Sequence, residues 1–164
     1  MPIISNTSPL LNLAIIDQLD LVREQFTSVL VPEAVLEELC VDTALPGASV
    51  LRQALTEGWI QVQDVENRAL VQLLRRNLDR GESEAIALAI QHSATWLLLD
   101  ERDGRLAAKA LEIPVTGVLG ILLRAKQEGQ IASLRVAMEK LRDQAGFHIT
   151  PALFDDVLRA GGEL

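Results

Sequence analysis

Polar side chains able to bind a cation follow two predicted strands of this chain, at the points where the strands end. Asn6 comes directly after a short, mainly apolar segment at residues 2–5, and Asp100 and Glu101 follow a continuous apolar run at 96–99. In an open parallel sheet, ligands bind outside the carboxyl ends of the strands. We therefore expect these side chains to meet at one edge of a sheet.

Further carboxylates lie on the helices predicted beside that edge, namely Glu33, Glu37, Glu38, Glu82 and Glu84. Converging carboxylates repel one another unless a proton or a cation neutralises them, and hard oxygen ligands select Mg²⁺ or Mn²⁺. Such ions can orient a water molecule and stabilise the leaving oxygen in phosphodiester hydrolysis. The pattern favours a nuclease, although any α/β protein with 23 acidic residues places some of them near strand ends.

The elements that must position these residues alternate between strand and helix. Apolar segments of strand length lie at residues 2–5, 28–31, 59–62, 96–99 and 114–116. Helical stretches are expected at about 9–15, 17–24, 32–40, 48–57, 67–78, 82–92, 105–111, 118–128, 131–144 and 151–160. This alternation predicts the α/β class, as a three-layer α/β/α sandwich with a central parallel sheet. We expect one domain over 1–164, with the helices from about 131 as an added layer.

Composition and charge narrow the functional classes. Lys and Arg total 15 against 23 Asp and Glu, a net charge of −8. Because phosphate contacts dominate generic nucleic-acid binding, this balance argues against a plain DNA-binding module and is compatible with an enzyme that gathers carboxylates around a cation. The longest nearly apolar run, 113–123, is shorter than the roughly 18 residues of a membrane span. We see no secretion signal, and expect a cytoplasmic protein with no membrane association.

Several residues have simpler structural interpretations. Ser8, which precedes a proline, is a helix-start signal whose hydroxyl can accept a hydrogen bond from an early helical N–H. Asp100 can serve as the cap of the next helix. The lone cysteine, Cys40, is expected to be a small core residue. Trp59 and Trp96 are expected in the core of their strands.

Five motifs follow one another along the chain, at residues 5–10 (SNTSPL), 35–39 (VLEEL), 81–89 (GESEAIALA), 98–105 (LLDERDGR) and 115–122 (VTGVLGIL). Each motif alone is weak, but the set covers most of the chain in order. Together they resemble one branch of the PIN-domain family, which includes VapC-like toxins of toxin–antitoxin pairs. The resemblance implies an α/β/α fold, Mg²⁺- or Mn²⁺-dependent endoribonuclease activity on RNA, a homodimer and a cognate antitoxin protein.

The resemblance also implies the site residues, by their positions in the motifs. Its acidic ligands fall on Glu38, Glu84 and Asp100, the predicted catalytic residues, with Glu101 as the neighbour of Asp100. The aspartate of the first motif falls on Asn6. An amide oxygen can bind a hard cation but brings no charge, so we expect weaker metal affinity. Which of Asp100 and Glu101 faces the metal stays open.

The remaining predicted roles concern the substrate and the choice of ligand on the third motif. Glu82 is a second, weaker candidate beside Glu84, because acids in the first turns of a helix are favoured by its dipole whatever the function. The candidates for contacts with RNA or for placing ligand and water are Thr7, Ser8, Arg102 and Arg105.

Two other functions are compatible with the sequence to different degrees. Asn6 favours a catalytically weak or inactive PIN-like module that acts by binding RNA or a partner. A receiver-like signalling domain would share the parallel fold with acidic strand ends. Such a domain needs an acidic pair after its first strand, where this chain has Ser5, Asn6 and Thr7, so this alternative is disfavoured.

Overall fold

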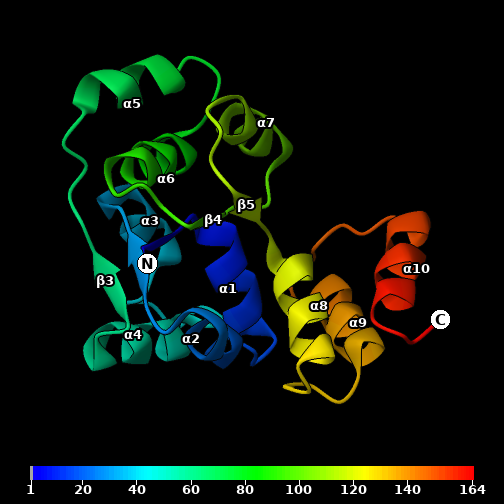
Figure 1. Cartoon of the computed structure of the whole chain (residues 1–164). Helices are drawn as coiled ribbons and strands as arrows, with labels where there is room; N and C mark the ends of the chain where they lie inside the picture. Colours follow the sequence, from blue (N-terminus) through cyan, green and yellow to red (C-terminus); the bar gives the residue numbers. More distant parts are fainter. Residues whose placement is uncertain (1) are drawn as a thin grey trace.

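The computed structural model, which describes residues 2–164, contains a five-stranded sheet in the order β3-β2-β1-β4-β5 (Figure 1). Every neighbouring pair of strands is parallel. The chain builds outward from β1 to β3 and then returns to the other side of β1 for β4 and β5, so the winding reverses between β1 and β4. The strands are β1 (Ile3–Ser5), β2 (Val29–Val31), β3 (Ile60–Val62), β4 (Trp96–Leu98) and β5 (Val115–Thr116).

Helices cover both faces of this sheet, which confirms the predicted α/β fold (Figure 1). One layer holds α5 (Arg68–Leu74), α6 (Arg80–Gln91) and α7 (Arg102–Ala110). The other holds α1, α2, α4 and α8, and α3 lies between α1 and α6. The bounds of these and of the C-terminal helices are α1 (Thr7–Ile15), α2 (Asp20–Phe26), α3 (Glu33–Leu39), α4 (Ala48–Glu57), α8 (Val118–Gln127), α9 (Leu134–Asp143) and α10 (Pro151–Ala160).

Alternating side chains of the short strands fill two separate cores. In β1, Ile3 packs into the core under α1, α2 and α8, whereas Ile4 packs into the core under α5, α6 and α7. The residues around β4 alternate in the same way, with Leu98 in the first core and Leu97 and Leu99 in the second. Successive strand residues point to opposite faces, so a strand buried on both sides must be apolar throughout. Each fully buried Leu or Ile side chain contributes about 1.5–3 kcal/mol to this packing.

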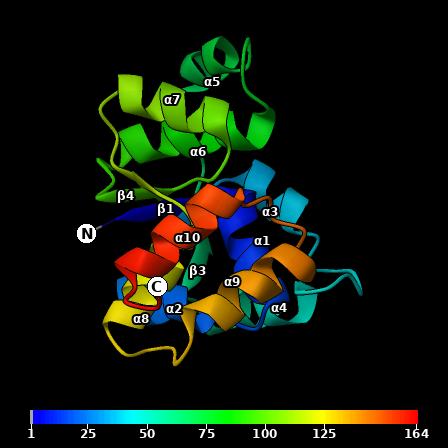
Figure 2. The same cartoon turned by 90° about the vertical axis from the view of Figure 1, so that its right-hand side faces the viewer.

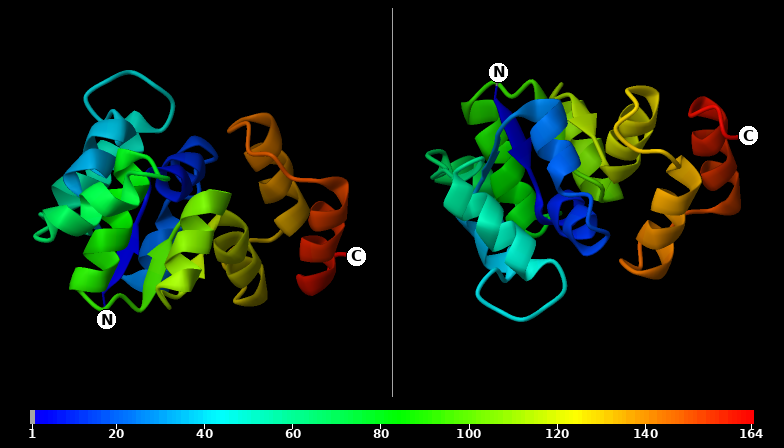
Figure 3. Two further views of the ribbon diagram at one scale, coloured as in Figure 1. Left: turned by 90° about the horizontal axis from the view of Figure 1, so that it is seen from above. Right: turned by 90° about the horizontal axis from the view of Figure 1, so that it is seen from below.

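The C-terminal helices α9 and α10 stand beside α8, on the flank of the molecule remote from β3 (Figures 1 and 3). Met138 and Leu141 of α9 and Leu158 of α10 are fully buried and belong to the core shared with α8. Gly161 lies against the Leu134 side chain, because a Cβ built there would be 2.6 Å from Leu134 Cδ2. None of the helices that the structure describes has the length and apolar character needed to span a membrane.

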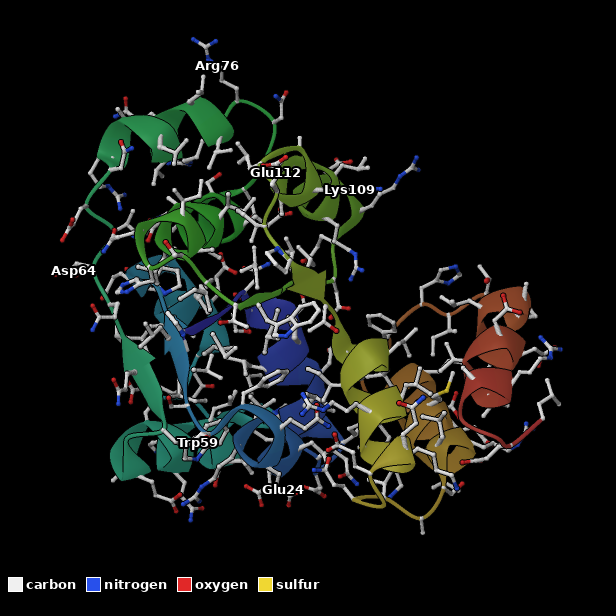
Figure 4. All side chains as sticks on the ribbon, viewed as in Figure 1. Glu24, Trp59, Asp64, Arg76, Lys109 and Glu112 are labelled. Atoms are coloured by element: carbon white, nitrogen blue, oxygen red, sulfur yellow. The ribbon has the colours of Figure 1, made fainter. Side chains whose placement is uncertain are left out.

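Two predictions about buried residues are wrong. Trp96 opens β4 at its amino end and is 38% exposed, whereas Trp59 is buried as predicted (Figure 4). Cys40 is half-buried and ends α3 with a left-handed backbone, φ 52°. It terminates a helix rather than filling the core. The sequence pattern predicted the strand near Trp96 and the helix near Cys40. It did not predict that each residue lies at the end of its element.

Helix starts also differ from those predicted, and the differences bear on the site. The first helix begins at Thr7 rather than at about residue 9, with Asn6 as its N-cap and no side-chain cap. The hydroxyl of Ser8 therefore does not cap this helix. The third-motif helix begins at Arg80, because Asp79 and Glu82 form a reciprocal capping box across its first turn.

Candidate functional site

The ends of β1 and β4 lie side by side at the carboxyl edge of the sheet. Ser5 pairs with Leu98, and the backbone N–H of Asn6 donates to the Leu98 carbonyl at 2.9 Å. These neighbouring strands carry the point where the winding of the sheet reverses, the usual ligand position in open α/β sheets. The structure thus brings Asn6 and the segment that starts at Asp100 to the predicted edge.

Glu101 joins the two strand ends through hydrogen bonds. Its Oε2 accepts from Asn6 Nδ2 at 3.1 Å, and its Oε1 accepts from the Ser8 hydroxyl. The negative charge of Glu101 is among the causes that raise the pKa values of Asp100 and Glu82. Glu101 is therefore within electrostatic reach of both carboxyls and lies at the centre of the acidic group.

Glu38 reaches this region from α3. Its Oε2 accepts a hydrogen bond of 2.5 Å from the Thr7 hydroxyl, so the first turn of α1 holds Glu38 through Thr7 and Glu101 through Ser8. Glu38 also lies against the start of α6, because a Cβ built on Gly81 would be 2.5 Å from Glu38 Oε1. Thr7 and Ser8 thus orient acidic side chains in this structure.

Glu82 faces the same region from the first turn of α6. It is 7% exposed, and a Cβ built on Gly104 of α7 would be 2.6 Å from its Oε2. Burial is the largest of the causes that raise the pKa of Glu82 to about 7, followed by the charge of Asp79 and, less strongly, that of Glu101. A buried carboxyl with raised pKa lacks a positive partner.

Glu84 is turned to a different neighbourhood. It is 1% exposed, and its oxygens accept from the Ala34 N–H at 3.2 Å, Arg80 Nε at 2.9 Å and Arg68 Nη2 at 3.3 Å. Burial alone raises its pKa, but these three hydrogen bonds outweigh burial and lower it. The carboxylate predicted as the third ligand is thus already neutralised at the contact between α3 and α6. Glu82 differs, because its Oε2 is buried without a hydrogen-bond partner.

Asp100 is held by the start of α8 and does not cap α7, whose N-cap is Glu101. Its Oδ1 accepts a hydrogen bond of 3.1 Å from the Val118 N–H, and a side chain at Gly117 would collide with that oxygen. Burial is the main cause that raises the pKa of Asp100 to about 6; the Val118 N–H lowers it and the charge of Glu101 raises it.

Three buried acceptor oxygens in this region have no hydrogen-bond partner: Asn6 Oδ1, Glu82 Oε2 and Asp100 Oδ2. A buried polar atom without a partner costs about 1–3 kcal/mol, and such atoms are commonly satisfied by an ion or a water molecule. Oxygen donors of this kind fit Mg²⁺ or Mn²⁺. Within residues 2–164, however, no three His, Cys, Asp or Glu side chains are gathered as a ready-made metal cluster. The three oxygens without a partner belong to two carboxyl groups and one amide.

Two hollows adjoin the acidic group, and both are lined by Asp100 and Arg105. The α7 hollow, of about 470 Å³, is also lined by Arg102, Leu106, Lys109, Ile113 and Val115. The second hollow, of about 450 Å³, is also lined by Gly117, Phe147, His148 and Leu153. We call it the hairpin hollow, because Phe147 and His148 belong to the loop of the α9–α10 helical hairpin. The Arg105 Nη1 donates to the Leu99 carbonyl at 3.0 Å, which fixes its guanidinium between the two hollows.

Cations at the α7 hollow are free to meet an anion. Across residues 2–164, neither Arg102 nor Lys109 forms an ion pair, and both side chains are exposed. Figure 4 shows Lys109 extending outward from α7. In a chain of net charge −8, this cationic lining beside buried carboxylates is the chemistry expected of a site for a phosphate-bearing ligand.

The chain is thus a parallel α/β module with acidic side chains at the switch point of its sheet. Residues 2–163 match the family described as a PIN domain, so the chain belongs to the PIN-domain family. The match spans nearly the whole chain and confirms the resemblance carried by the five motifs. A comparison with curated proteins gave no match.

Proposed function

We propose that this chain is a divalent-metal-dependent endoribonuclease that hydrolyses phosphodiester bonds of RNA. PIN-domain proteins are typically nucleases that use divalent metals, and the chain belongs to that family. The single observation that carries the proposal is the set of three unpartnered buried oxygens on Asn6, Glu82 and Asp100. A hard cation binds oxygen acceptors of this kind, and the switch point of a parallel sheet is a usual position for a ligand.

In this proposal Asn6, Glu82 and Asp100 hold Mg²⁺ or Mn²⁺, with Glu38 and Glu101 as further carboxylates of the site. The ion, when bound, supplies charge that stabilises the developing oxyanion and activates water. Thr7 and Ser8 keep Glu38 and Glu101 in place through their hydroxyl groups. Glu84, the ligand that the motifs imply, instead supports the site by fixing the start of α6 to α3.

In this proposal the basic side chains beside Asp100 bind the RNA substrate. Arg102 and Lys109 attract the phosphates of the strand toward the α7 hollow, and Arg105, anchored on the Leu99 carbonyl, holds a phosphate next to Asp100. These side chains offset the repulsion that an acidic protein exerts on RNA. Their role is to bind and orient the strand.

The test is cleavage of single-stranded RNA by the purified protein, in EDTA and after addition of Mn²⁺ or Mg²⁺. We expect cutting only with the metal, and a loss of at least about a hundredfold in Glu82→Gln and Asp100→Asn, since each removes a charge from the ion's surroundings. Arg124→Gln is a remote control, because Arg124 pairs with Glu128 on the surface. Absence of metal-dependent cutting by the parent protein would refute the catalytic proposal.

A second candidate function is favoured by Asn6 specifically. A neutral amide in place of a carboxylate weakens the hold on a cation, so the chain can act as a PIN-like module that occupies RNA or a partner without turnover. Retained RNA binding without cleavage at saturating Mn²⁺ distinguishes this function from the enzyme.

The biological setting that the family resemblance implies is also a proposal. We propose that the protein works in the cytoplasm as the toxin of a toxin–antitoxin pair and forms a homodimer. Light scattering of the purified chain tests the dimer. Growth arrest on expression, relieved by a co-expressed small protein from the adjacent gene, tests the toxin role.

A further inference from the structure

The hairpin hollow brings an aromatic ring next to the candidate site. Its lining combines Asp100 and Arg105 with Phe147 and His148, which belong to the loop between α9 and α10. The chain has only three Phe, two Trp and no Tyr, so accessible aromatic surface is scarce. A ring placed within the same hollow as a candidate catalytic carboxylate is therefore a specific feature of this fold.

The loop that carries Phe147 is anchored on both sides. The Phe147 N–H donates to the Leu141 carbonyl at 3.1 Å, and Ile149 is buried in the core beneath α8. The Phe147 ring itself is half-buried, with part of its surface open to the hollow. A ring held in this way binds a flat partner with little loss of conformational entropy.

The other aromatic residue of this region has a different environment. The ring of Phe154 on α10 lies under the guanidinium groups of Arg135 and Arg142, at 5.9 and 5.6 Å from their central carbons. Phe154 therefore has a cation–π partner within the protein, whereas Phe147 contributes its surface to the hollow. Of the two rings, Phe147 is the one available to a ligand.

Small residues leave room opposite the loop. Gly117 and Gly120 line the hollow where β5 passes into α8, and a Cβ on Gly117 would also lie 2.9 Å from Arg105 Nη1. The hollow has about 450 Å³, within the roughly 300–1,000 Å³ typical of small-ligand sites. Its lining combines apolar walls and one aromatic ring with one guanidinium, one imidazole and the carboxyl group of Asp100. The ring and the guanidinium suit a planar heterocycle attached to an anionic backbone.

We propose that the hairpin hollow is a nucleobase subsite, in which an unpaired base of the RNA strand stacks on Phe147 beside the phosphate to be cut. This inference rests on the proposed ribonuclease function and names Phe147 as the residue that contacts the base next to the cut. Base-specific RNA recognition uses unstacked bases laid on aromatic side chains, which a base paired in a duplex cannot supply. His148 and Arg105 provide polar groups for the edge of the base and the adjoining phosphate.

The subsite assigns a role to the C-terminal helices. The strand would run from the cations of the α7 hollow, across Arg105 and Asp100, to the ring of Phe147. The phosphate contacts set affinity, and the stacked base sets which nucleotide adjoins the cut. The α9–α10 hairpin (Figure 2) is then a specificity element attached beside the edge of the sheet.

The experiment measures RNA affinity by fluorescence anisotropy in a Glu82→Gln background, which prevents cleavage and leaves the lining of the hairpin hollow unchanged. Phe147→Leu keeps apolar volume and removes the stacking face; Phe147→Tyr restores it; Phe154→Leu is the matched control. We expect Phe147→Leu to weaken binding of a labelled single strand at least about fivefold, as the loss of one base stack does. Phe147→Tyr and Phe154→Leu are expected to bind this strand as tightly as the Glu82→Gln protein without a second substitution.

Two further probes separate stacking from general damage. Binding of the same RNA paired to its complement, and the dependence of affinity on salt, stay unchanged in Phe147→Leu, because phosphate contacts are retained. If Phe147→Leu and Phe154→Leu bind the single strand equally while the parent protein cleaves RNA, the subsite is wrong and the ribonuclease proposal stands. If the parent neither binds nor cuts RNA with Mn²⁺, the ribonuclease proposal itself fails. Equal weakening for single strand and duplex overturns the subsite as well.

Discussion

The side-chain nitrogen of Asn6 donates a hydrogen bond of 3.1 Å to Glu101 Oε2, across 95 positions of sequence. A carboxylate accepts only, so the amide must present its NH₂ group to Glu101 and turn Oδ1 away. That Oδ1 is buried without a partner. An asparagine at this position binds Glu101 without like-charge repulsion, and its neutral Oδ1 stays available to a cation.

The first prediction concerns Asn6→Asp. Without metal, the new carboxylate faces Glu101 and loses the hydrogen bond, so we expect a lower midpoint of thermal unfolding in EDTA. With Mn²⁺, the added charge raises affinity about tenfold, measured by titration calorimetry. Asn12→Asp adds the same charge elsewhere on α1 and is the control. Unchanged Mn²⁺ affinity in Asn6→Asp would show that this side chain is not a ligand.

The second prediction separates Glu82 from Glu84. Glu82→Gln is expected to abolish cleavage with little loss of stability, because it removes a buried charge that has no cationic partner. Glu84→Gln is expected to lower the free energy of unfolding by about 1–3 kcal/mol, since charged hydrogen bonds with Arg80 and Arg68 are lost.

Urea unfolding and cleavage assays on the same preparations measure both quantities. Under conditions in which Glu84→Gln remains folded, it should cut RNA at close to the parent rate. A folded Glu84→Gln that has lost cleavage, beside an active Glu82→Gln, would return the third-ligand role to Glu84.

The alternation of strands and helices could be predicted from sequence because the central strands β1, β2 and β4 have mostly buried side chains on both faces. Such strands must be continuously apolar, and the turn residues that end them are polar, so the pattern is local. The segment Leu97, Leu98 and Leu99 is the clearest case, since these side chains alternate between the two cores. The same pattern predicted that Asn6 and Asp100 follow strands and lie at one edge of the sheet, but not that their strands are neighbours.

The different surroundings of Glu82 and Glu84 could not be predicted in the same way. Glu82 and Glu84 are two positions apart on a helix, about 200° around its axis, so the sequence implies that only one faces the site. Which one depends on partners distant in sequence, namely Gly104 for Glu82 and Ala34 for Glu84. One local signal was available: Asp79 and Glu82 have the spacing of a capping box, which places Glu82 in the first turn of α6.

The third prediction is a dependence of stability on pH. Burial raises the pKa of Glu82 from its ordinary value of 4.5 to about 7, and that of Asp100 from 3.8 to about 6. Between these limits the folded state binds protons that the unfolded state has released, so the free energy of unfolding falls as pH rises. The slope is at most about 1.4 kcal/mol per pH unit for each carboxyl.

Urea unfolding in EDTA between pH 5.5 and 8 measures this slope, which should be smaller in Glu82→Gln. Saturating Mn²⁺ should restore stability most strongly at pH 8, since metal binding requires ionised carboxylates. A metal-free protein whose stability increases from pH 5.5 to 8 would contradict the raised pKa values of these two buried carboxyls.

The fourth prediction tests how closely α7 approaches Glu82. A Cβ at Gly104 would lie 2.6 Å from Glu82 Oε2 and 3.1 Å from a methyl carbon of Leu99. Gly104→Ala is also a helix-favouring change, worth up to about 1 kcal/mol, so helix stability opposes the crowding. We expect near-parent thermal stability and a fall in cleavage of at least about tenfold, because displacement of a reacting group by 1 Å can cost a hundredfold.

Gly161→Ala is the matched control, since its Cβ would meet Leu134 Cδ2 at the same 2.6 Å, far along the chain on the C-terminal helices. If the added methyl group acted only by lowering stability, each variant would lose cleavage activity in proportion to the decrease in its midpoint of thermal unfolding. Loss of cleavage confined to Gly104→Ala, with Mn²⁺ affinity reduced in parallel, assigns the effect to the Glu82 carboxylate. Full activity in Gly104→Ala would mean that the position of Glu82 does not matter to the reaction.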